Sequence, residues 1–202
     1  MKLYYSPAAC SLSPHIALRE AGLPFTLEKV DLKTKQTETG ADFLQVNSSG
    51  YVPALLLDSG EMLTEGPAIV QWIADQVPEK KLAPPNGTIE RVRLQEWLNF
   101  VSTELHKSHT PLFNPAAPEE WKTMMRELIA KRYATLAQKL EGRDFLMGND
   151  FTVADAYLFV VMSWGRWVQV DLSPWPVLLA YKARVSARPA VQAALAAEGL
   201  LK

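Results

Sequence analysis

Residues 50–67 read GYVPALLLDSGEMLTEGP, and this stretch decides the fold. Its apolar run Ala54–Leu57 is typical of a buried strand. Ser59-Gly60 then predicts a tight turn, from which Met62–Thr64 returns as the second strand of a hairpin. Pro67 comes soon after the hairpin, and proline is well tolerated in the first turn of a helix. The stretch therefore predicts a hairpin followed at once by a helix.

The residues upstream of this stretch alternate between strand and helix patterns. In the second upstream strand the sequence FTLEKVD has an imperfect period of two, and we expect Phe25, Leu27 and Val30 to face inward. A polar segment rich in lysine and threonine follows at residues 33–40. The resulting order is β-α-β-α-β-β-α. The upstream elements are expected as strands at 2–5 and 25–31 and as helices at 11–21 and 41–46.

A change of composition divides the chain into two domains. Residues 80–88 combine prolines, a glycine and lysines, which marks a linker between a domain at 1–79 and a domain at 89–202. Every pattern after the linker is helical. The outline is a small α/β domain followed by an all-helical domain. Helices are expected at 89–110, where Pro111 ends the pattern, and at 118–140, 152–167, 174–187 and 189–197.

One of these helices has a clear start signal. Thr152 and Asp155 have capping-box spacing, with a hydroxyl at the N-cap and an acid three residues later. Phe151 precedes the cap, where an apolar residue often packs against the first turn. We interpret the pair as a structural feature of a core helix and not as a functional site.

The overall composition excludes several classes of protein. The chain has 202 residues, 48% of them hydrophobic, and a net charge of -1, so neither nucleic acid nor an anionic membrane is an expected partner. The longest apolar stretches are far shorter than the ~20 residues of a membrane span. No signal peptide is apparent, which favours a cytoplasmic location. The single cysteine, Cys10, excludes an internal disulfide and a multi-cysteine metal site.

Cys10 follows the first predicted strand and turn, at or just before the start of a helix. Backbone N–H groups at a helix N-terminus are unpaired, and the helix dipole favours negative charge there. A thiolate in such a position is stabilised and therefore reactive. Isolated cysteines also occur as small packing residues, so the residues alone leave both readings of Cys10 open.

Two further groups carry possible chemistry. His106 and His109 share a helix face, but Glu104 lies on another face and no carboxylate completes a metal site, so we expect no metal. His106, with Lys107 beside it, either faces a domain cleft or is an exposed surface residue. Glu65-Gly66 lies at a strand-to-helix junction, where N–H donors and an acid suit a ligand that carries both an ammonium and a carboxylate group. His15 is expected to be structural or solvated.

Five segments, taken together, carry a resemblance that spans essentially the whole chain. They closely resemble the beta-class glutathione transferases, which have a thioredoxin-like α+β domain followed by an all-α domain. The resemblance agrees with the outline derived above, and it implies a glutathione transferase. The segments are MKLYYSPAACSLSPHIALREAG, YVPALLLD, LTEGPAIVQW, EWLNFVSTELHKSHTPLFNP and FTVADAYLF.

The resemblance also implies a glutathione site in the first domain. Cys10 matches the cysteine beside the glutathione sulfur, with which it can form a mixed disulfide. Val52-Pro53 matches a segment with a cis-proline, where the Val52 backbone pairs with the cysteinyl part of glutathione as an added strand does. Glu65-Gly66 matches the site of the γ-glutamyl end, where some relatives carry serine in place of Gly66. Lys35 matches the basic residue near the glycyl carboxylate.

In the helical domain the resemblance implies further glutathione contacts and a homodimer. Asn99 and His106 match residues that face the cleft, with Lys107 next to His106. Thr103 and Glu104 match positions that reach the partner subunit's glutathione. The bound thiolate would attack a small electrophile, with chlorinated aromatic intermediates as one substrate class and detoxification as the role. Phe113 and Trp164 would form an apolar wall for this electrophile.

Two alternatives to conjugation stay open. Cys10 could exchange disulfides with glutathione, which would make the protein a thiol reductase or a reductive dehalogenase. A protein with this fold could instead be a non-catalytic glutathione or ligand carrier, because fold alone does not prove activity. The presence of Cys10, Glu65, Asn99 and His106 together argues against the carrier.

Overall fold

The computed structural model describes residues 1–201, and the chain forms two compact units. Unit 1 consists of Met1–Leu82 and Pro189–Lys202, and unit 2 consists of Ala83–Arg188. Each unit has its own buried core and is described by itself. None of the helices in residues 1–201 combines the length and the apolar character that a membrane crossing requires.

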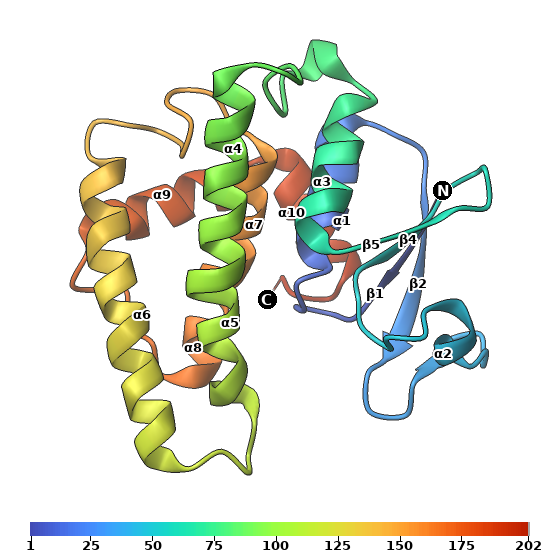
Figure 1. Cartoon of the computed structure of the whole chain (residues 1–202), viewed down its shortest axis with the longest axis horizontal. Coiled ribbons are helices and arrows are strands. Elements are labelled where there is room, and N and C mark those ends of the chain that lie inside the picture. The colour runs from blue at the N-terminus through green and yellow to red at the C-terminus, as the bar shows by residue number, and fades with distance from the viewer. Residues whose placement is uncertain (202) are drawn as a thin grey trace. The chain divides into compact units, whose positions relative to one another are not determined.

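Unit 1 is built on a mixed five-stranded sheet of strand order β3-β2-β1-β4-β5. β1 and β2 are parallel and are connected through α1. β4 pairs antiparallel with β1, and β4 and β5 form the predicted antiparallel hairpin. Figure 1 shows α1 and α3 together beside this sheet. The elements are β1 (Lys2–Tyr5), α1 (Leu12–Ala21), β2 (Thr26–Asp31), β3 (Gln36–Thr37), α2 (Phe43–Val46), β4 (Ala54–Leu56), β5 (Met62–Thr64), α3 (Gly66–Asp75), η1 (Pro78–Lys80) and α10 (Pro189–Ala197).

The sheet differs from the sequence expectation around β2. Val30 is fully buried as predicted, but Phe25 and Leu27 are only half-buried, and Glu28 is buried instead. The Glu28 carboxylate accepts a hydrogen bond of 2.6 Å from the Thr39 hydroxyl, which makes burial of this charge possible. Part of the polar segment at 33–40 also forms the short strand β3, which pairs antiparallel with β2.

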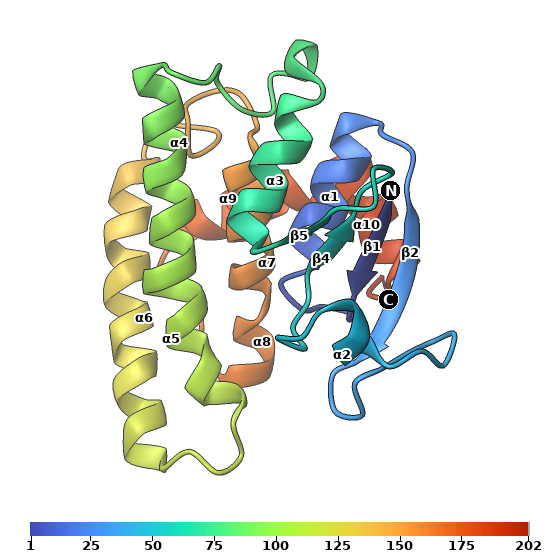
Figure 2. The same ribbon diagram turned by 45° about the vertical axis from the view of Figure 1, so that its right-hand side comes forward.

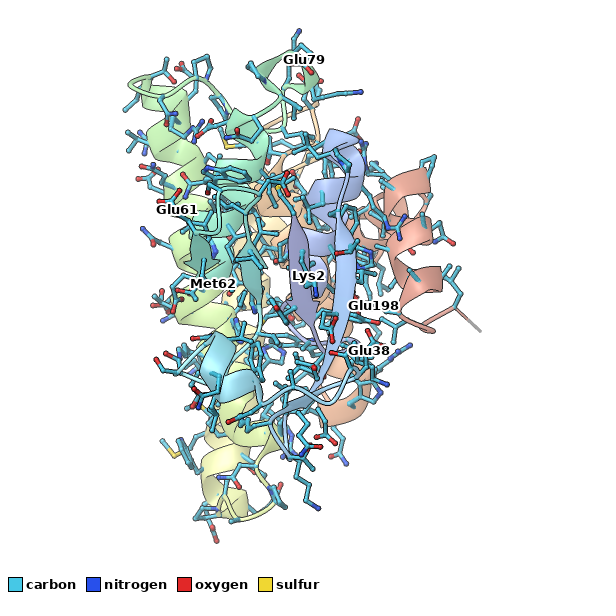
Figure 3. All side chains as sticks on the ribbon, turned by 90° about the vertical axis from the view of Figure 1, so that its right-hand side faces the viewer. Lys2, Glu38, Glu61, Met62, Glu79 and Glu198 are labelled. Atoms are coloured by element: carbon cyan, nitrogen blue, oxygen red, sulfur yellow. The ribbon has the colours of Figure 1, made fainter. Side chains whose placement is uncertain are left out.

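The C-terminal helix α10 belongs to unit 1, whereas the sequence boundary placed it in a domain at 89–202. It packs against α1, and the two helices lie side by side in Figures 1 and 2. Glu198, which follows α10 (Figure 3), hydrogen-bonds to His15 of α1. This packing and the buried hydrogen bond explain why the last turns of the chain group with the sheet.

Unit 2 is all-helical and is organised around α7. The ten residues Val153–Met162 of α7 are all buried, which fits a helix that is apolar on every face. Figures 1 and 2 show α4 and α5 running beside the long helix α6. The elements are α4 (Ile89–Phe100), η2 (Val101–His106), α5 (Lys107–His109), η3 (Thr110–Phe113), α6 (Glu119–Leu140), α7 (Val153–Ser163), α8 (Gly165–Val168) and α9 (Pro176–Ser186).

The expected continuous helix at 89–110 contains a change of helix type. η2 is a π-helical turn, and a short α-helical turn and a 3₁₀ turn follow it before the chain leaves the helix. π-turns inside α-helices are frequently found at functional sites, and this one contains Glu104 and His106. The expected helix at 152–167 likewise divides into α7 and α8, with Trp164 between them.

The predicted capping box is confirmed. Thr152 caps α7, and the Asp155 carboxylate accepts hydrogen bonds from the Thr152 backbone N–H at 2.8 Å and from its hydroxyl at 2.9 Å. The same carboxylate also accepts the Leu146 N–H and the Tyr181 hydroxyl, each at 2.8 Å. The pair is therefore a buried structural hub of unit 2, as the sequence indicated.

Candidate active site

Cys10 lies in the loop between β1 and α1 of unit 1, and its side chain is half-buried. Its Sγ donates a hydrogen bond of 3.2 Å to the backbone oxygen of Val52. Inside the loop, the Ser11 hydroxyl bonds to both the N–H and the carbonyl oxygen of Ser6. These bonds fix the loop and hold the sulfur beside the segment that precedes β4.

The start of α1 differs from the expectation of unpaired N–H groups around Cys10. The N–H groups of Leu12 and Ser13 donate to the carbonyl oxygens of Ala9 and Cys10, at 3.0 and 3.1 Å. A tight turn thus lies directly before α1, and its hydrogen bonds pair these two N–H groups. The favourable dipole of α1 remains, because the peptide units of the helix are still aligned.

The Val52–Pro53 peptide bond is cis, as the resemblance implied. Gly66, the first residue of α3, lies close to this proline: a Cβ atom at Gly66 would be 3.9 Å from Pro53 Cγ and 4.0 Å from Ser13 Oγ. Ser13 in turn donates from its hydroxyl to the Cys10 carbonyl oxygen at 3.1 Å. Unit 1 therefore brings Cys10, the cis-proline and the start of α3 together.

Lys35 and Glu65 both have unusual backbone conformations. Their φ angles are +60° and +65°, which are strained values for residues other than glycine and are often found at ligand sites. Lys35 Nζ donates a hydrogen bond of 2.8 Å to the Gly50 carbonyl oxygen and lies 5.5 Å from the centroid of the Tyr51 ring. The Glu65 carbonyl oxygen accepts the N–H groups of Ala68 and Ile69 and so begins α3.

In unit 2 the four polar residues predicted around η2 have different surroundings. Asn99 and Thr103 are exposed, and the Thr103 hydroxyl donates to the Asn99 carbonyl oxygen at 2.9 Å. Glu104 Oε2 accepts a hydrogen bond of 2.6 Å from Arg132 Nε, which orients its carboxylate. Lys107 is exposed.

His106 is the centre of an aromatic cluster in unit 2. Its Nδ1 lies 2.6 Å from the hydroxyl oxygen of Tyr157, and its ring packs edge-to-face against Trp164 with centroids 4.8 Å apart. Trp164 also contacts His109 and Phe113, at centroid distances of 5.7 and 5.9 Å. Phe113 is 48% exposed, so this cluster continues to the surface of the unit.

Burial controls the charge of both histidines in the cluster. It lowers the pKa of His106 to about 4, and repulsion from Lys107 and His109 acts in the same direction. Burial also lowers the pKa of His109, although a hydrogen bond to the Leu105 carbonyl oxygen opposes the effect. His106 is therefore a neutral imidazole at pH 7. No group of three or more histidine, cysteine or carboxylate residues that could hold a metal occurs in residues 1–201.

The sequence did not identify two residues that contact predicted site residues or their loop, Glu198 and Tyr157. Glu198 holds the Cys10 loop, because its Oε2 accepts the Ala8 N–H at 3.0 Å while its Oε1 pairs with His15. No local signal could have revealed this contact, since Glu198 is 183 positions from His15. Tyr157 gave no signal of a functional role either, because it lies in the apolar run of α7 and has the pattern of a core residue.

Both halves of the chain match one protein family. Residues 8–76 match the family described as glutathione S-transferase, N-terminal domain, and residues 100–189 match glutathione S-transferase, C-terminal domain. The chain is also 48% identical over 200 residues to the glutathione S-transferase GstA of Escherichia coli O157:H7, with 99% of this chain and 100% of that protein covered. The protein belongs to the glutathione S-transferase family.

Solved structures agree with the beta-class resemblance. A bacterial beta-class glutathione S-transferase from Sphingomonas chungbukensis is 51% identical to this chain with a TM-score of 0.96. A sphingomonad glutathione S-transferase, solved in complex with glutathione, is 52% identical with a TM-score of 0.96. Both comparisons cover 100% of each chain. The predicted class, a thioredoxin-like α+β domain with an all-α domain, is thereby confirmed.

Proposed function

We propose that this glutathione transferase conjugates glutathione to small electrophiles. The thiolate of bound glutathione attacks an electrophilic carbon, a carbon–sulfur bond forms, and in a substitution the leaving group departs with its electron pair. Binding and positioning supply most of the rate enhancement in such a reaction. Family membership supports the proposal, as does the presence of each residue that the resemblance assigns to glutathione.

The observation that carries the proposal is the line of contacts along residues 50–53 of unit 1. Lys35 Nζ binds the carbonyl oxygen of Gly50, Cys10 Sγ binds that of Val52, and the start of α3 at Gly66 lies against Pro53. An extended tripeptide beside these residues would meet a cation at one end, a sulfur in the middle and a helix start at the other. This order fits the glycyl carboxylate, the cysteinyl thiol and the γ-glutamyl end of glutathione.

We further propose a homodimer, a cytoplasmic location and a role in detoxification, with chlorinated aromatic compounds as one class of electrophile. The family resemblance supports the homodimer. Tyr51, which is 71% exposed, and Ile89 of α4, which is 62% exposed, are large apolar side chains available to such an interface. In this proposal Thr103 and Glu104 serve the partner subunit's glutathione. Size-exclusion chromatography with light scattering tests the dimer.

Disulfide exchange through Cys10 is the second candidate function, because the thiol is only half-buried and lies in the loop just before α1. In exchange, the Cys10 thiolate attacks one sulfur of oxidised glutathione, a protein–glutathione disulfide forms, and one glutathione thiolate leaves.

Turnover of an electrophilic aromatic compound by protein that is retained on immobilised glutathione would exclude the non-catalytic carrier.

Intact-protein mass spectrometry tests both chemistries at Cys10. After incubation with oxidised glutathione we expect a gain of ~305 Da that a reductant reverses and that Cys10→Ala abolishes. We expect Cys10→Ala to keep at least part of its conjugation activity, because the thiolate that attacks the electrophile belongs to glutathione and not to the protein. Complete loss of conjugation in a folded Cys10→Ala variant would favour exchange chemistry as the main function.

A gain-of-function variant tests the γ-glutamyl site at Gly66. Because a Cβ atom there meets other atoms only at 3.9 Å or beyond, Gly66→Ser should fit and add a hydroxyl donor to the site. One added hydrogen bond is worth about 1 kcal/mol, so we expect the KM for glutathione to fall roughly fivefold. Gly66→Ala is the matched control, since it adds the Cβ without the hydroxyl. Equal KM values for the two variants would contradict the placement.

A further inference from the structure

Tyr157 and His106 form the shortest side-chain hydrogen bond to a histidine in residues 1–201, at 2.6 Å. The two side chains come from different elements, since His106 ends η2 and Tyr157 lies in α7, 51 positions later. Tyr157 is 3% exposed, whereas His106 is half-buried. A rigid core side chain therefore holds one nitrogen of a histidine that reaches the surface of unit 2.

The direction of this hydrogen bond follows from acid–base chemistry. A phenol is a far better proton donor than a neutral imidazole N–H, because its pKa is about 10. An imidazole nitrogen with a lone pair is in turn a better acceptor than a phenolic oxygen. The Tyr157 hydroxyl therefore donates to Nδ1 of His106. Since a neutral imidazole carries only one proton, that proton lies on Nε2.

We propose that Tyr157 is a positioning residue that holds His106 as a neutral imidazole with its proton on Nε2, so that Nε2 of His106 is a hydrogen-bond donor and not a general base. The inference rests on the proposed function only where it gives His106 a part in conjugation. The tautomer itself is a property of unit 2 and involves no ligand.

A neutral donor suits the proposed reaction better than a base. The reactive form of glutathione is the thiolate, and a donor that is already oriented stabilises this anion without a proton transfer. A base at His106 would need a lone pair on Nε2, which requires the opposite tautomer. The low pKa of His106, about 4, also makes it a weak acceptor for a thiol proton at pH 7.

The other two histidines of the chain provide internal references. His15 Nε2 accepts a hydrogen bond of 2.9 Å from Arg19 Nε, which is always a donor, so the proton of a neutral His15 lies on Nδ1. His109 Nδ1 lies 2.8 Å from the Leu105 carbonyl oxygen, which can only accept, so Nδ1 of His109 carries its proton. His106 alone is expected to be protonated on Nε2.

Long-range ¹H–¹⁵N correlation spectra of the ligand-free protein at pH 7 test the tautomer directly, because protonated and unprotonated ring nitrogens have well-separated ¹⁵N shifts. Single His→Gln variants assign the three rings. We expect one Nε2–H ring, that of His106, and two Nδ1–H rings. A proton on Nδ1 of His106, or on both nitrogens, would overturn the proposal whatever the enzyme's activity.

Tyr157→Phe tests the link between the tautomer and the reaction. We expect the ¹⁵N shift of His106 Nδ1 to move toward that of an unbonded nitrogen, and kcat for conjugation to fall about tenfold, which corresponds to one lost hydrogen bond. The KM for glutathione should change much less. Tyr133→Phe is the matched control, because the Tyr133 hydroxyl is buried and has no hydrogen-bond partner in the described chain.

The outcomes separate this inference from the proposed function. A wild-type protein that shows the Nε2–H tautomer but does not turn over electrophiles would refute the transferase proposal and leave the tautomer assignment standing. A wild-type protein that turns over electrophiles, with an unchanged kcat in Tyr157→Phe, would refute the positioning role. Equal losses of kcat in Tyr157→Phe and Tyr133→Phe would likewise refute it, because they would indicate a packing effect.

Discussion

Replacing Asp155 with alanine is expected to lower the free energy of unfolding by about 4 kcal/mol. The Asp155 carboxylate is fully buried and accepts four hydrogen bonds, from the N–H groups of Leu146 and Thr152, the Thr152 hydroxyl and the Tyr181 hydroxyl. Alanine leaves these donors without an acceptor, and each buried unpaired donor costs about 1–3 kcal/mol. The N-cap of α7 is lost at the same time.

Equilibrium unfolding in urea, followed by tryptophan fluorescence at a fixed protein concentration, measures this effect. Tyr181→Phe is the matched control: it removes one of the four donors and leaves the carboxylate in place, so we expect a loss of only about 1 kcal/mol. Burial raises the pKa of Asp155, and the hydrogen bonds to its carboxylate offset this rise only in part. An Asp155→Ala variant as stable as Tyr181→Phe would show that the carboxylate is not the hub of unit 2.

The Asp155 site also illustrates what could be predicted from the sequence. Both ends of the capping box lie within four residues, so the spacing alone identified it. The bounds of the β4–β5 hairpin and of helix α10 were predicted to within one residue. Hydrophobic period, turn residues and proline positions are local signals of the same kind. The cis bond at Val52–Pro53 came from the family resemblance and not from the residues themselves.

Features that depend on distant partners could not be predicted. The burial of Glu28 depends on Thr39, which lies on the far side of a turn. The apolar pattern of β2 therefore identified Val30 correctly but named Phe25 and Leu27, which are only half-buried, in place of Glu28. The packing of α10 on α1 depends on contacts between the two ends of the chain. The paired N–H groups in front of α1 result from a turn that propensity does not distinguish from a helix. The first two misses are tertiary effects that override a local preference, whereas the third is a local turn.

Replacing Glu198 with alanine is the prediction with the second largest expected effect, a loss of about 3 kcal/mol in the free energy of unfolding. The side chains of Glu198 and His15 are both fully buried, and Nδ1 of His15 lies 2.8 Å from Oε1 of Glu198. The other carboxylate oxygen accepts the N–H of Ala8, whose φ of +63° is a strained value for alanine. Alanine at 198 leaves two donors without this acceptor and releases the strained residue.

Because Ala8 lies two positions before Cys10, this variant should also loosen the Cys10 loop. We expect the rate of alkylation of Cys10 by iodoacetamide to change severalfold and the KM for glutathione to rise. Glu198→Gln should lose roughly half as much stability, since an amide offers one acceptor where both partners are donors. Glu79→Ala, at an exposed glutamate of the same unit, should leave the stability and the alkylation rate unchanged. A Glu198→Ala variant with unchanged stability and a normal alkylation rate would mean that other contacts hold the Cys10 loop. Lower stability together with a changed alkylation rate would show that Glu198, near the end of the chain, holds this loop near its beginning.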